Sequence, residues 1–169
     1  QQRIRRRSIG SVDGNLDGCH EMLVHPHTVP GLGDGGAHVG TICDGSFPTT
    51  LLHYWGRDRE RGTIDLPFLV HRHCAGTART VGLCDRGVLA PGYRADLNVV
   101  DFANLALRKP EIAYDLPAGG RRLLQRADGW LRTFVAGHET YRNGEATDAL
   151  PGRLVRSART APVRSGHSS

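Results

Sequence analysis

Apolar residues recur at helical spacing in three stretches of the first half of the chain, at 16–23, 48–61 and 67–83. This spacing predicts three helices. Gly82 stands near the end of the third stretch, where a glycine commonly terminates a helix. Between the first two predicted helices, the short apolar run 28–30 predicts an extended strand, and a glycine-rich stretch follows it.

The second half of the chain has shorter apolar runs separated by turn residues, which is the pattern of strands. The passages expected to contain strands are 95–101, 118–122, 130–136 and 139–142. The first of these, 95–101, is apolar enough to predict a buried strand, and the turn-rich residues 87–92 precede it. Asn143-Gly144 predicts a tight turn directly after the last strand.

The two ends of the chain differ from its middle. Residues 1–12 are basic and irregular, while 151–169 contains Arg, Ser, Gly and Pro without a periodic apolar face. We expect the C-terminal tail to be disordered. The chain therefore divides into an irregular basic N-terminus at 1–12, a mainly helical part at 13–84, a strand-rich part at 85–150 and the tail at 151–169.

The chain has 169 residues, which suffice for one medium domain. A complete (β/α)8 barrel needs about 250 residues. Hydrophobic residues make up 38% and charged residues 23%, as in ordinary globular proteins. No apolar run approaches the roughly 20 residues that cross a bilayer, and the first residues lack the apolar core of a secretory signal. We expect no membrane partner and a cytoplasmic location.

The net charge of +5 would suit an anionic partner such as nucleic acid. Lys109 is the only lysine among 22 basic residues, and many of the arginines lie in the first seven residues or after Pro151. The few aromatic residues do not interleave with arginines as a groove for single strands requires. We therefore interpret the basic ends as solvated and expect no nucleic-acid partner.

The four cysteines form no C-x-x-C pair, so we expect free thiols. Cysteines and histidines do gather between Cys19 and Cys43, but their spacing matches no standard zinc motif. An isolated structural zinc is therefore not expected. His71 and His73 lie two residues apart on a predicted helix, where side chains point in nearly opposite directions and cannot bind one ion.

Asp34 is the strongest catalytic candidate in the sequence. It lies in the glycine-rich loop, which we define as residues 31–38, with glycines on both sides. These glycines leave no side chain that would keep a ligand from the carboxylate. The alternative is a glycine-rich turn in which Asp34 caps a following helix, and the local pattern leaves both interpretations open.

Four stretches of the chain resemble the C-terminal part of amidohydrolase-superfamily enzymes, in particular the D-aminoacylase (N-acyl-D-amino-acid deacylase) group. These stretches are 25–38, 77–83, 87–101 and 135–144. Their order and spacing, more than any one of them, carry the likeness, which extends roughly over 16–155. The family fold is a (β/α)8 barrel with a small β-sandwich built from both chain ends. The resemblance therefore implies an α/β fold in which 13–84 is the last barrel strand with its C-terminal helices and 85–150 is part of the sandwich.

The resemblance also implies a mechanism. In the family an aspartate after the eighth barrel strand lies at a zinc site, and Asp34 falls on that aspartate. Zinc would polarise the amide carbonyl and lower the pKa of a bound water, and Asp34 would take the water's proton and return it to the leaving nitrogen. The family's metal ligands come from strands far upstream, which have no counterpart here. We carry no ligand role to His25 or His27, although they spell H-x-H.

Two further groups are weighed for a role at the site. His38 follows Asp34 by four residues and could contact substrate or orient Asp34, although a packed or solvent-facing histidine is the commoner case. Arg57, Arg59 and Arg61 could meet a substrate carboxylate, but we interpret them as a solvated helix end.

The sequence thus predicts the C-terminal segment of a zinc-dependent enzyme that hydrolyses the amide bond of N-acyl-D-amino acids. We expect the chain to be inactive alone and to need the N-terminal barrel portion as its partner. The alternatives are a noncatalytic remnant or basic binding module, and an amidohydrolase that acts on another amide or a cyclic amide.

Overall fold

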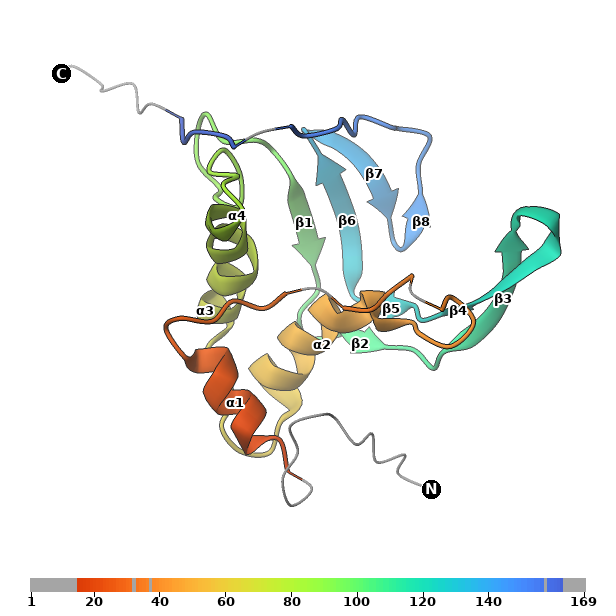
Figure 1. Ribbon diagram of the computed structural model, residues 1–169, viewed down its shortest axis with the longest axis horizontal. Coiled ribbons are helices and arrows are strands. Elements are labelled where there is room, and N and C mark those ends of the chain that lie inside the picture. Colours follow the sequence, from red (N-terminus) through yellow and green to blue (C-terminus); the bar gives the residue numbers. More distant parts are fainter. Residues whose placement is uncertain (1–14, 32, 37, 157, 163–169) are drawn as a thin grey trace.

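The helices of the protein lie on one side of the molecule and the strands on the other (Figure 1). The computed structural model describes residues 15–31, 33–36, 38–156 and 158–162. The predicted basic segment at 1–12 and the end of the predicted tail, 163–169, lie outside these residues. No helix in the described ranges has the length and apolar character needed to cross a membrane.

The three predicted helices are confirmed. Their segments are α1 (Asp17–Val24), α2 (Phe47–His53), η2 (Tyr54–Asp58), α3 (Leu66–His71), η3 (Arg72–Gly76) and α4 (Thr77–Thr80), and a short 3-10 turn, η1 (Asp44–Ser46), precedes α2. Prolines in the first turn of α2 and α3 suit these helix starts because their missing N–H would have no partner there. Gly82 has φ +75°, so it ends the third helix as predicted.

Two of the helical segments are π-helical, which the sequence pattern did not predict. The turn η2 directly continues α2, and the turn η3 directly continues α3. A π turn is rare and inserts into an α-helix as a single widened turn. Each of these two turns contains an arginine, Arg57 in η2 and Arg72 in η3, that binds main-chain carbonyls of a distant segment.

The strand predicted at 28–30 is not present. Residues 28–31 have no regular secondary structure, and no strand among the described residues pairs with them. A strand needs a neighbouring strand to satisfy its backbone groups. Here the Arg72 guanidinium, and not a neighbouring strand, binds the carbonyl oxygen of Thr28. The physical reason for the wrong prediction is therefore the missing partner, not the local residue preference.

The second half of the chain forms antiparallel strands in three small sheets. The strands are β1 (Leu97–Val100), β2 (Ala106–Leu107), β3 (Glu111–Leu116), β4 (Gly120–Leu124), β5 (Ala127–Asp128), β6 (Trp130–Val135), β7 (His138–Arg142) and β8 (Glu145–Ala146). Four of them form a sheet in the order β1-β6-β7-β8, while β2 pairs with β5 and β3 with β4. The four passages expected to contain strands are confirmed as β1, β4, β6 and β7, whereas β2, β3, β5 and β8 were not predicted. Asn143 and Gly144, with φ +51° and +83°, form the predicted tight turn between β7 and β8.

The prediction that 95–101 is a buried strand is wrong in one respect. The strand β1 exists, but Val99 is 45% exposed. β1 lies at the edge of its sheet, and pairs only with β6. An apolar run indicates burial on both faces only where further layers cover the strand, and in the described residues one face of β1 stays partly open.

The β3–β4 hairpin extends away from the rest of the molecule (Figure 1). Ala118 and Gly119, both with positive φ, make its turn. On β3, Ile112 is 55% and Tyr114 is 69% exposed. The hairpin therefore shows two large apolar side chains to solvent.

The hydrophobic core joins the helices to the start of the β region. Its buried members are Leu51, Leu52, Trp55, Ile64, Leu69 and Leu105. The indole N–H of Trp130 on β6 donates to the hydroxyl of Thr49 on α2 over 2.9 Å. The fold is thus a mixture of helices and antiparallel strands around one core, and the division at residue 85 into two structural parts stays a prediction.

Part of the tail that we expected to be disordered lies against the end of the third helix. The N–H of Arg159 donates to the carbonyl of Gly82 over 2.7 Å, and the N–H of Cys84 donates to the carbonyl of Arg159 over 2.9 Å. These two bonds form an isolated parallel bridge between Leu83 and Arg159. Backbone pairing of this kind does not depend on an apolar periodicity, so the sequence pattern gave no sign of it.

Candidate functional site

The glycine-rich loop folds back against the turn that begins the second helix. A Cβ added to Gly33 would lie 2.7 Å from the carbonyl oxygen of Asp44, and one added to Gly35 would lie 2.8 Å from the backbone nitrogen of Gly45. Both distances are shorter than real Cβ contacts allow. Gly33 and Gly35 are therefore needed for the close approach of two backbone segments, with Asp34 between them.

Asp34 is exposed to solvent. It caps neither of the helical segments that follow, since η1 begins after Cys43 and α2 begins after Ser46. The capping interpretation of the loop is thus wrong. The other interpretation predicted that the glycines leave space for a ligand, and Gly31 and Gly36 do have open space at the position of a Cβ. The carboxylate is accessible, as a proton-transferring group must be, and its catalytic role stays a prediction.

His38 contributes its main chain to a turn at the end of the loop. Its carbonyl oxygen accepts bonds from the N–H of Thr41 at 2.7 Å and the N–H of Ile42 at 3.2 Å. The residue has φ +46°, which is uncommon for a side chain other than glycine. The imidazole is exposed. The structure therefore assigns a local turn to the backbone of His38, and the predicted substrate contact of its side chain is untested.

Arg72 binds the segment that leads into the glycine-rich loop. The guanidinium donates to the carbonyl oxygens of His25, Pro26 and Thr28 over 2.6, 3.2 and 2.7 Å. We call these three oxygens the Arg72 carbonyl cluster. Sequence reasoning missed this residue because the bonds join positions more than forty residues apart.

The end of the loop is fixed by the β3–β4 hairpin and the residue after it. The N–H of Leu123 on β4 donates to the carbonyl oxygen of Val39 over 2.6 Å. The hydroxyl of Ser46 donates to the side-chain oxygen of Gln125 over 2.6 Å. The loop with Asp34 is therefore bounded on one side by a helix and on the other by a strand.

An apolar cavity of about 420 Å³ lies beside the glycine-rich loop. It is lined by Leu23, Pro30, Gly31, Gly33, Asp44, Ser46, Phe47, Thr50, Leu51 and Trp55. Two glycines of the loop contribute to its wall, but Asp34 does not line it. The cavity is a space between α1, the loop and α2, and its polar side chains are those of Asp44, Ser46 and Thr50.

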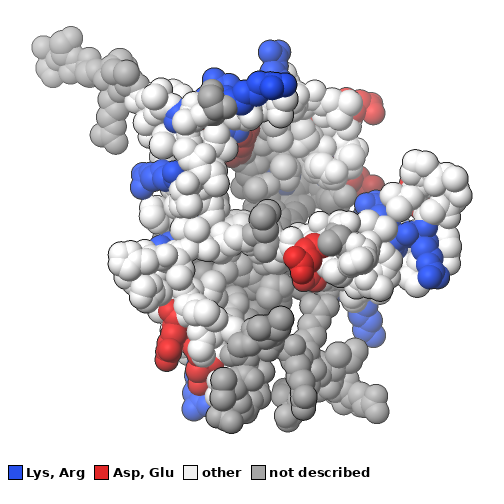
Figure 2. All heavy atoms as spheres, viewed as in Figure 1, with Lys and Arg blue, Asp and Glu red and all other residues white. Residues whose placement is uncertain are grey.

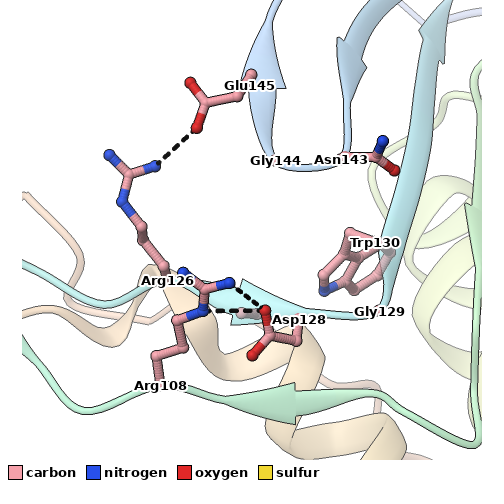
Figure 3. Close-up of a pocket in the computed structure, with 9 residues that line it drawn as sticks. Arg108, Arg126, Asp128, Gly129, Trp130, Asn143, Gly144 and Glu145 are labelled. Carbon is pink, nitrogen blue, oxygen red and sulfur yellow. Dashed lines mark hydrogen bonds and ion pairs between the residues drawn. The ribbon is translucent and has the colours of Figure 1, made fainter.

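A second cavity of about 440 Å³ lies between the β2–β5 pair and the β7–β8 turn (Figure 3). Its charged groups are paired with one another. Arg108 binds Asp128 through two nitrogens, and Arg126 lies 3.9 Å from Glu145 across the opening. Since both arginines already have carboxylate partners, this cavity offers no unpaired charge to a ligand.

The prediction that Arg57, Arg59 and Arg61 form a solvated helix end is wrong for the first two. Arg57 donates to the carbonyl oxygens of Phe102, Ala103 and Leu105, which we call the Arg57 carbonyl cluster. The Arg59 guanidinium lies 5.1 Å from the Trp55 ring and binds Asp17. Only Arg61 is exposed. The first two arginines connect segments of the fold and are not available to a substrate carboxylate.

Asp58 has the strongest resolved shift in acidity. Hydrogen bonds from the Arg57 guanidinium, and after them the bond with His53, lower the pKa of the Asp58 carboxyl to about 2. The Nδ1 of His53 lies 2.9 Å from an Asp58 oxygen, while its Nε2 is buried without a partner in the described part of the chain. This cluster lies at the junction of α2 and the β region, away from Asp34 in the sequence.

The described residues do not fit a zinc site. They contain no group of three or more His, Cys, Asp or Glu side chains that could hold a metal ion. The rings of His25 and His27 lie 5.5 Å apart and are exposed. His71 is exposed as well, whereas His73 packs edge-on against Phe47, where burial lowers the pKa of its imidazole.

The positive side chains of the described residues lie in separate groups on the face shown in Figure 2. Blue side chains gather at the top of that view and on the β3–β4 hairpin, with neutral atoms and acidic groups between them. Several arginines of the β region also pair with carboxylates, as Arg122 does with Asp115.

Comparison with known proteins gives a consistent answer. Residues 6–147 match the sequence profile described as Amidohydrolase family. The chain is 33% identical over 117 residues to a D-aminoacylase of Alcaligenes xylosoxydans xylosoxydans, an alignment that covers 69% of this chain and 21% of that protein. It is 36% identical over 84 residues to a 5-methylthioadenosine/S-adenosylhomocysteine deaminase of Desulfitobacterium hafniense, covering 44% of this chain and 20% of that protein.

A solved structure of a D-aminoacylase is also similar, with 31% sequence identity and a TM-score of 0.44 over 61% of this chain and 19% of that chain. The chain spans about a fifth of the length of the curated relatives it matches.

Proposed function

Because this chain belongs to the amidohydrolase family, we propose that it supplies the Asp34-bearing segment of an enzyme that hydrolyses the amide bond of N-acyl-D-amino acids. The proposal rests on the exposure and the position of the Asp34 side chain. Its carboxylate is exposed, it caps no helix, and it lies on a loop that is fixed at both ends. The D-aminoacylase match, which covers 69% of the chain, supports the substrate class.

The fold fits into this proposal as follows. The helices α1 to α4 and the glycine-rich loop correspond to the end of a (β/α)8 barrel, and the strands correspond to part of the small β-sandwich. In the complete barrel, a neighbouring strand would pair with residues 28–31, which have no strand partner among the described residues. The partner of this chain is thus the remaining portion of the barrel. A cytoplasmic location stays a prediction from the sequence.

Asp34 acts in the proposed reaction through proton transfer. As a carboxylate it accepts a proton from the attacking water, and as a carboxylic acid it donates that proton to the amide nitrogen when the C–N bond breaks. The glycines around it allow the substrate to approach the carboxylate without a clash. The family is generally metal-dependent, but since the described residues do not fit a zinc site, no step is assigned to a metal bound by this chain.

A second candidate follows from the deaminase match. That relative is a 5-methylthioadenosine/S-adenosylhomocysteine deaminase. Removal of an amino group by water also breaks a C–N bond and needs a group that moves a proton from the water to the leaving nitrogen. Asp34 would transfer the proton in either reaction. The deacylase and the deaminase candidates therefore differ in their substrate and not in the role of Asp34.

A chimera tests the proposed function. Residues 16–147 replace the matching segment of the Alcaligenes D-aminoacylase, and hydrolysis of N-acetyl-D-methionine and deamination of adenosine substrates are measured. We expect deacylase activity in the chimera and a decrease of about 10²- to 10⁴-fold in kcat for Asp34→Asn, because a general acid–base group contributes that much. The exposed Asp65 gives a matched control, Asp65→Asn, which should leave kcat unchanged.

A folded chimera whose activity survives Asp34→Asn would contradict the assignment of Asp34. Deamination without deacylation would favour the second candidate. The isolated chain should hydrolyse no N-acetyl-D-amino acid even with added Zn²⁺, and activity of the isolated chain would refute the need for the barrel portion.

A further inference from the structure

Arg72 is the first residue of the π-helical turn η3, and its guanidinium points at the segment that leads into the glycine-rich loop. We infer that Arg72 is a positioning residue for Asp34, acting through the carbonyl oxygens of His25, Pro26 and Thr28. This inference rests on the proposed function of Asp34. It concerns the place of the carboxylate and assigns no chemical step to Arg72.

The geometry of the guanidinium suits this role. An arginine presents five N–H donors in a planar fork. Two nitrogens of Arg72 bind the three oxygens of the Arg72 carbonyl cluster at 2.6 to 3.2 Å. The ring of Phe68 lies 5.1 Å from the guanidinium carbon and limits its rotation. In the described part of the chain, no carboxylate pairs with Arg72, so its charge is directed to these carbonyl dipoles.

The segment that Arg72 binds has few other contacts. Within it, the N–H of Thr28 donates to the carbonyl of His25 over 3.2 Å, and the Thr28 hydroxyl donates to the same carbonyl over 3.0 Å. A Cβ on Gly76 of η3 would lie 3.8 Å from Val29, so the helix also touches the next residue. His25 and Pro26 are exposed. The N–H of His25 and the hydroxyl of Thr28 also donate to the carbonyl oxygen of Met22 on α1. Among the described residues, Arg72 supplies the hydrogen bonds that join this segment to the third helix.

The position of Asp34 depends on both ends of its loop. The end toward the second helix is held by the close backbone contact of Gly33 and Gly35 with Asp44 and Gly45. The other end begins at Gly31, three residues after Thr28, and Gly31 has open space at the position of a Cβ. Glycine restricts the backbone little, so it transmits no order from one end to the other. Without the Arg72 contact, this end would keep only the bonds to Met22 and the packing of Val29 against η3, so the carboxylate would be held less firmly on this side.

The test measures order in the full chain, independently of activity. Arg72→Met removes the donors and keeps much of the length of the side chain, and Arg72→Lys keeps the charge but places its three donors on one nitrogen and not on a planar fork. The control is Arg79→Met, because Arg79 is exposed on the same helical run. We expect the Thr28 amide to exchange hydrogen about tenfold faster in Arg72→Met, and the ¹³C carboxyl resonance of Asp34 to broaden, because local opening frees the segment. The amides of α2 and of the β1–β6–β7 sheet should keep their protection, and Arg72→Lys should be intermediate.

Chemical rescue separates positioning from folding. In Arg72→Ala, millimolar guanidinium ion should restore the slow exchange at Thr28, while methylammonium at the same concentration should not. Faster exchange over the whole chain, or an unchanged Asp34 resonance in a folded Arg72→Met variant, would overturn the inference. Failure of the proposed function looks different: the chimera would be inactive, or indifferent to Asp34→Asn, while the effect of Arg72 on the Asp34 resonance persisted.

Discussion

Two segments of this protein are bound in the same way but lie in different surroundings. Residues 102–105 and residues 25–28 each give three carbonyl oxygens to one arginine from a π-helical turn. Arg57 also binds both oxygens of Asp58 and lies over the ring of Phe102. Arg72 binds carbonyls and lies over Phe68.

The decisive difference between the segments is burial. Leu105, at the end of the first segment, is 0% exposed and belongs to the core. In the second segment, His25, Pro26 and His27 are exposed. A net hydrogen bond contributes about 1 kcal/mol, whereas full burial of a leucine side chain contributes about 1.5–3 kcal/mol. The first segment thus supports the whole fold, while the arginine of the second segment sets the local position of a loop.

The largest effect is expected from Leu105→Ala. The side chain is fully buried, so its loss leaves a cavity and should lower the free energy of unfolding by about 2–5 kcal/mol. Urea denaturation measures this change. The exposed Leu89 is the matched control, and Leu89→Ala should change stability by less than about 0.5 kcal/mol. If both variants lowered the free energy of unfolding equally, burial would not explain the difference between the two segments.

Arg57→Met should come next. It leaves the three oxygens of the Arg57 carbonyl cluster without their donor, and Asp58 keeps only its bond with His53. We therefore expect Tm to fall by roughly 5 °C. Arg72→Met should lower Tm by less than about half of that, because the segment it binds is exposed. A larger decrease in Tm for Arg72→Met than for Arg57→Met, measured by differential scanning calorimetry, would contradict the proposed difference between the two arginines.

Gly33→Ala should have a smaller effect that is confined to the loop. The new methyl would lie 2.7 Å from the Asp44 carbonyl oxygen, so the backbones must separate, at about 1 kcal/mol or somewhat more. Gly31→Ala is the control, since a Cβ there meets nothing within 4 Å. Amide exchange at Gly45 would report the separation. An unchanged Gly45 amide in Gly33→Ala would show that this contact does not hold the loop.

The smallest effect concerns the acidity of Asp58. Its folded pKa of about 2 lies below the ordinary value of 3.8. The ionised carboxyl therefore stabilises the fold above about pH 4, and this contribution is lost as the pH falls through about 2. Because the carboxyl is 42% exposed, solvent screening keeps the effect small. Asp58→Asn should flatten the dependence of Tm on pH between 4 and 2, and an unchanged slope would show that Asp58 is not the group responsible.

The sequence predicted the elements of this fold better than their contacts. Helices and strands follow from periodicities and turn residues that lie close together in the chain, as Asn143-Gly144 does between β7 and β8. The resemblance to amidohydrolases was also found from the sequence, and the family match confirms it. The strand at 28–30 was predicted from its residues alone, but a strand also requires a neighbour that no local pattern specifies.

The surroundings of the candidate site could not be predicted for a related reason. Asp34 was predicted as a candidate because glycines surround it. In the structure, Gly33 and Gly35 are also needed for the close approach to Asp44 and Gly45, and the local sequence pattern gave no sign of this contact. In the sequence, nothing distinguished Arg72 from the other arginines of the chain. Its role depends on the direction of one side chain across more than forty residues of sequence, and its direction follows from a helical turn that periodicity does not distinguish from an α-helix.

In the two π-helical turns, the number of residues determines the direction in which an arginine side chain points. A π turn holds one residue more than the α turn it replaces, so η2 and η3 are places where a single codon can be gained or lost while the helices before and after keep their faces. Deleting one residue within 54–58 or 72–76 would leave the composition almost unchanged and close the turn, yet it would point the arginine elsewhere. A scan of single-residue deletions would thus separate the effect of having each guanidinium from the effect of the direction in which it points. A substitution changes the side chain itself and cannot make this separation.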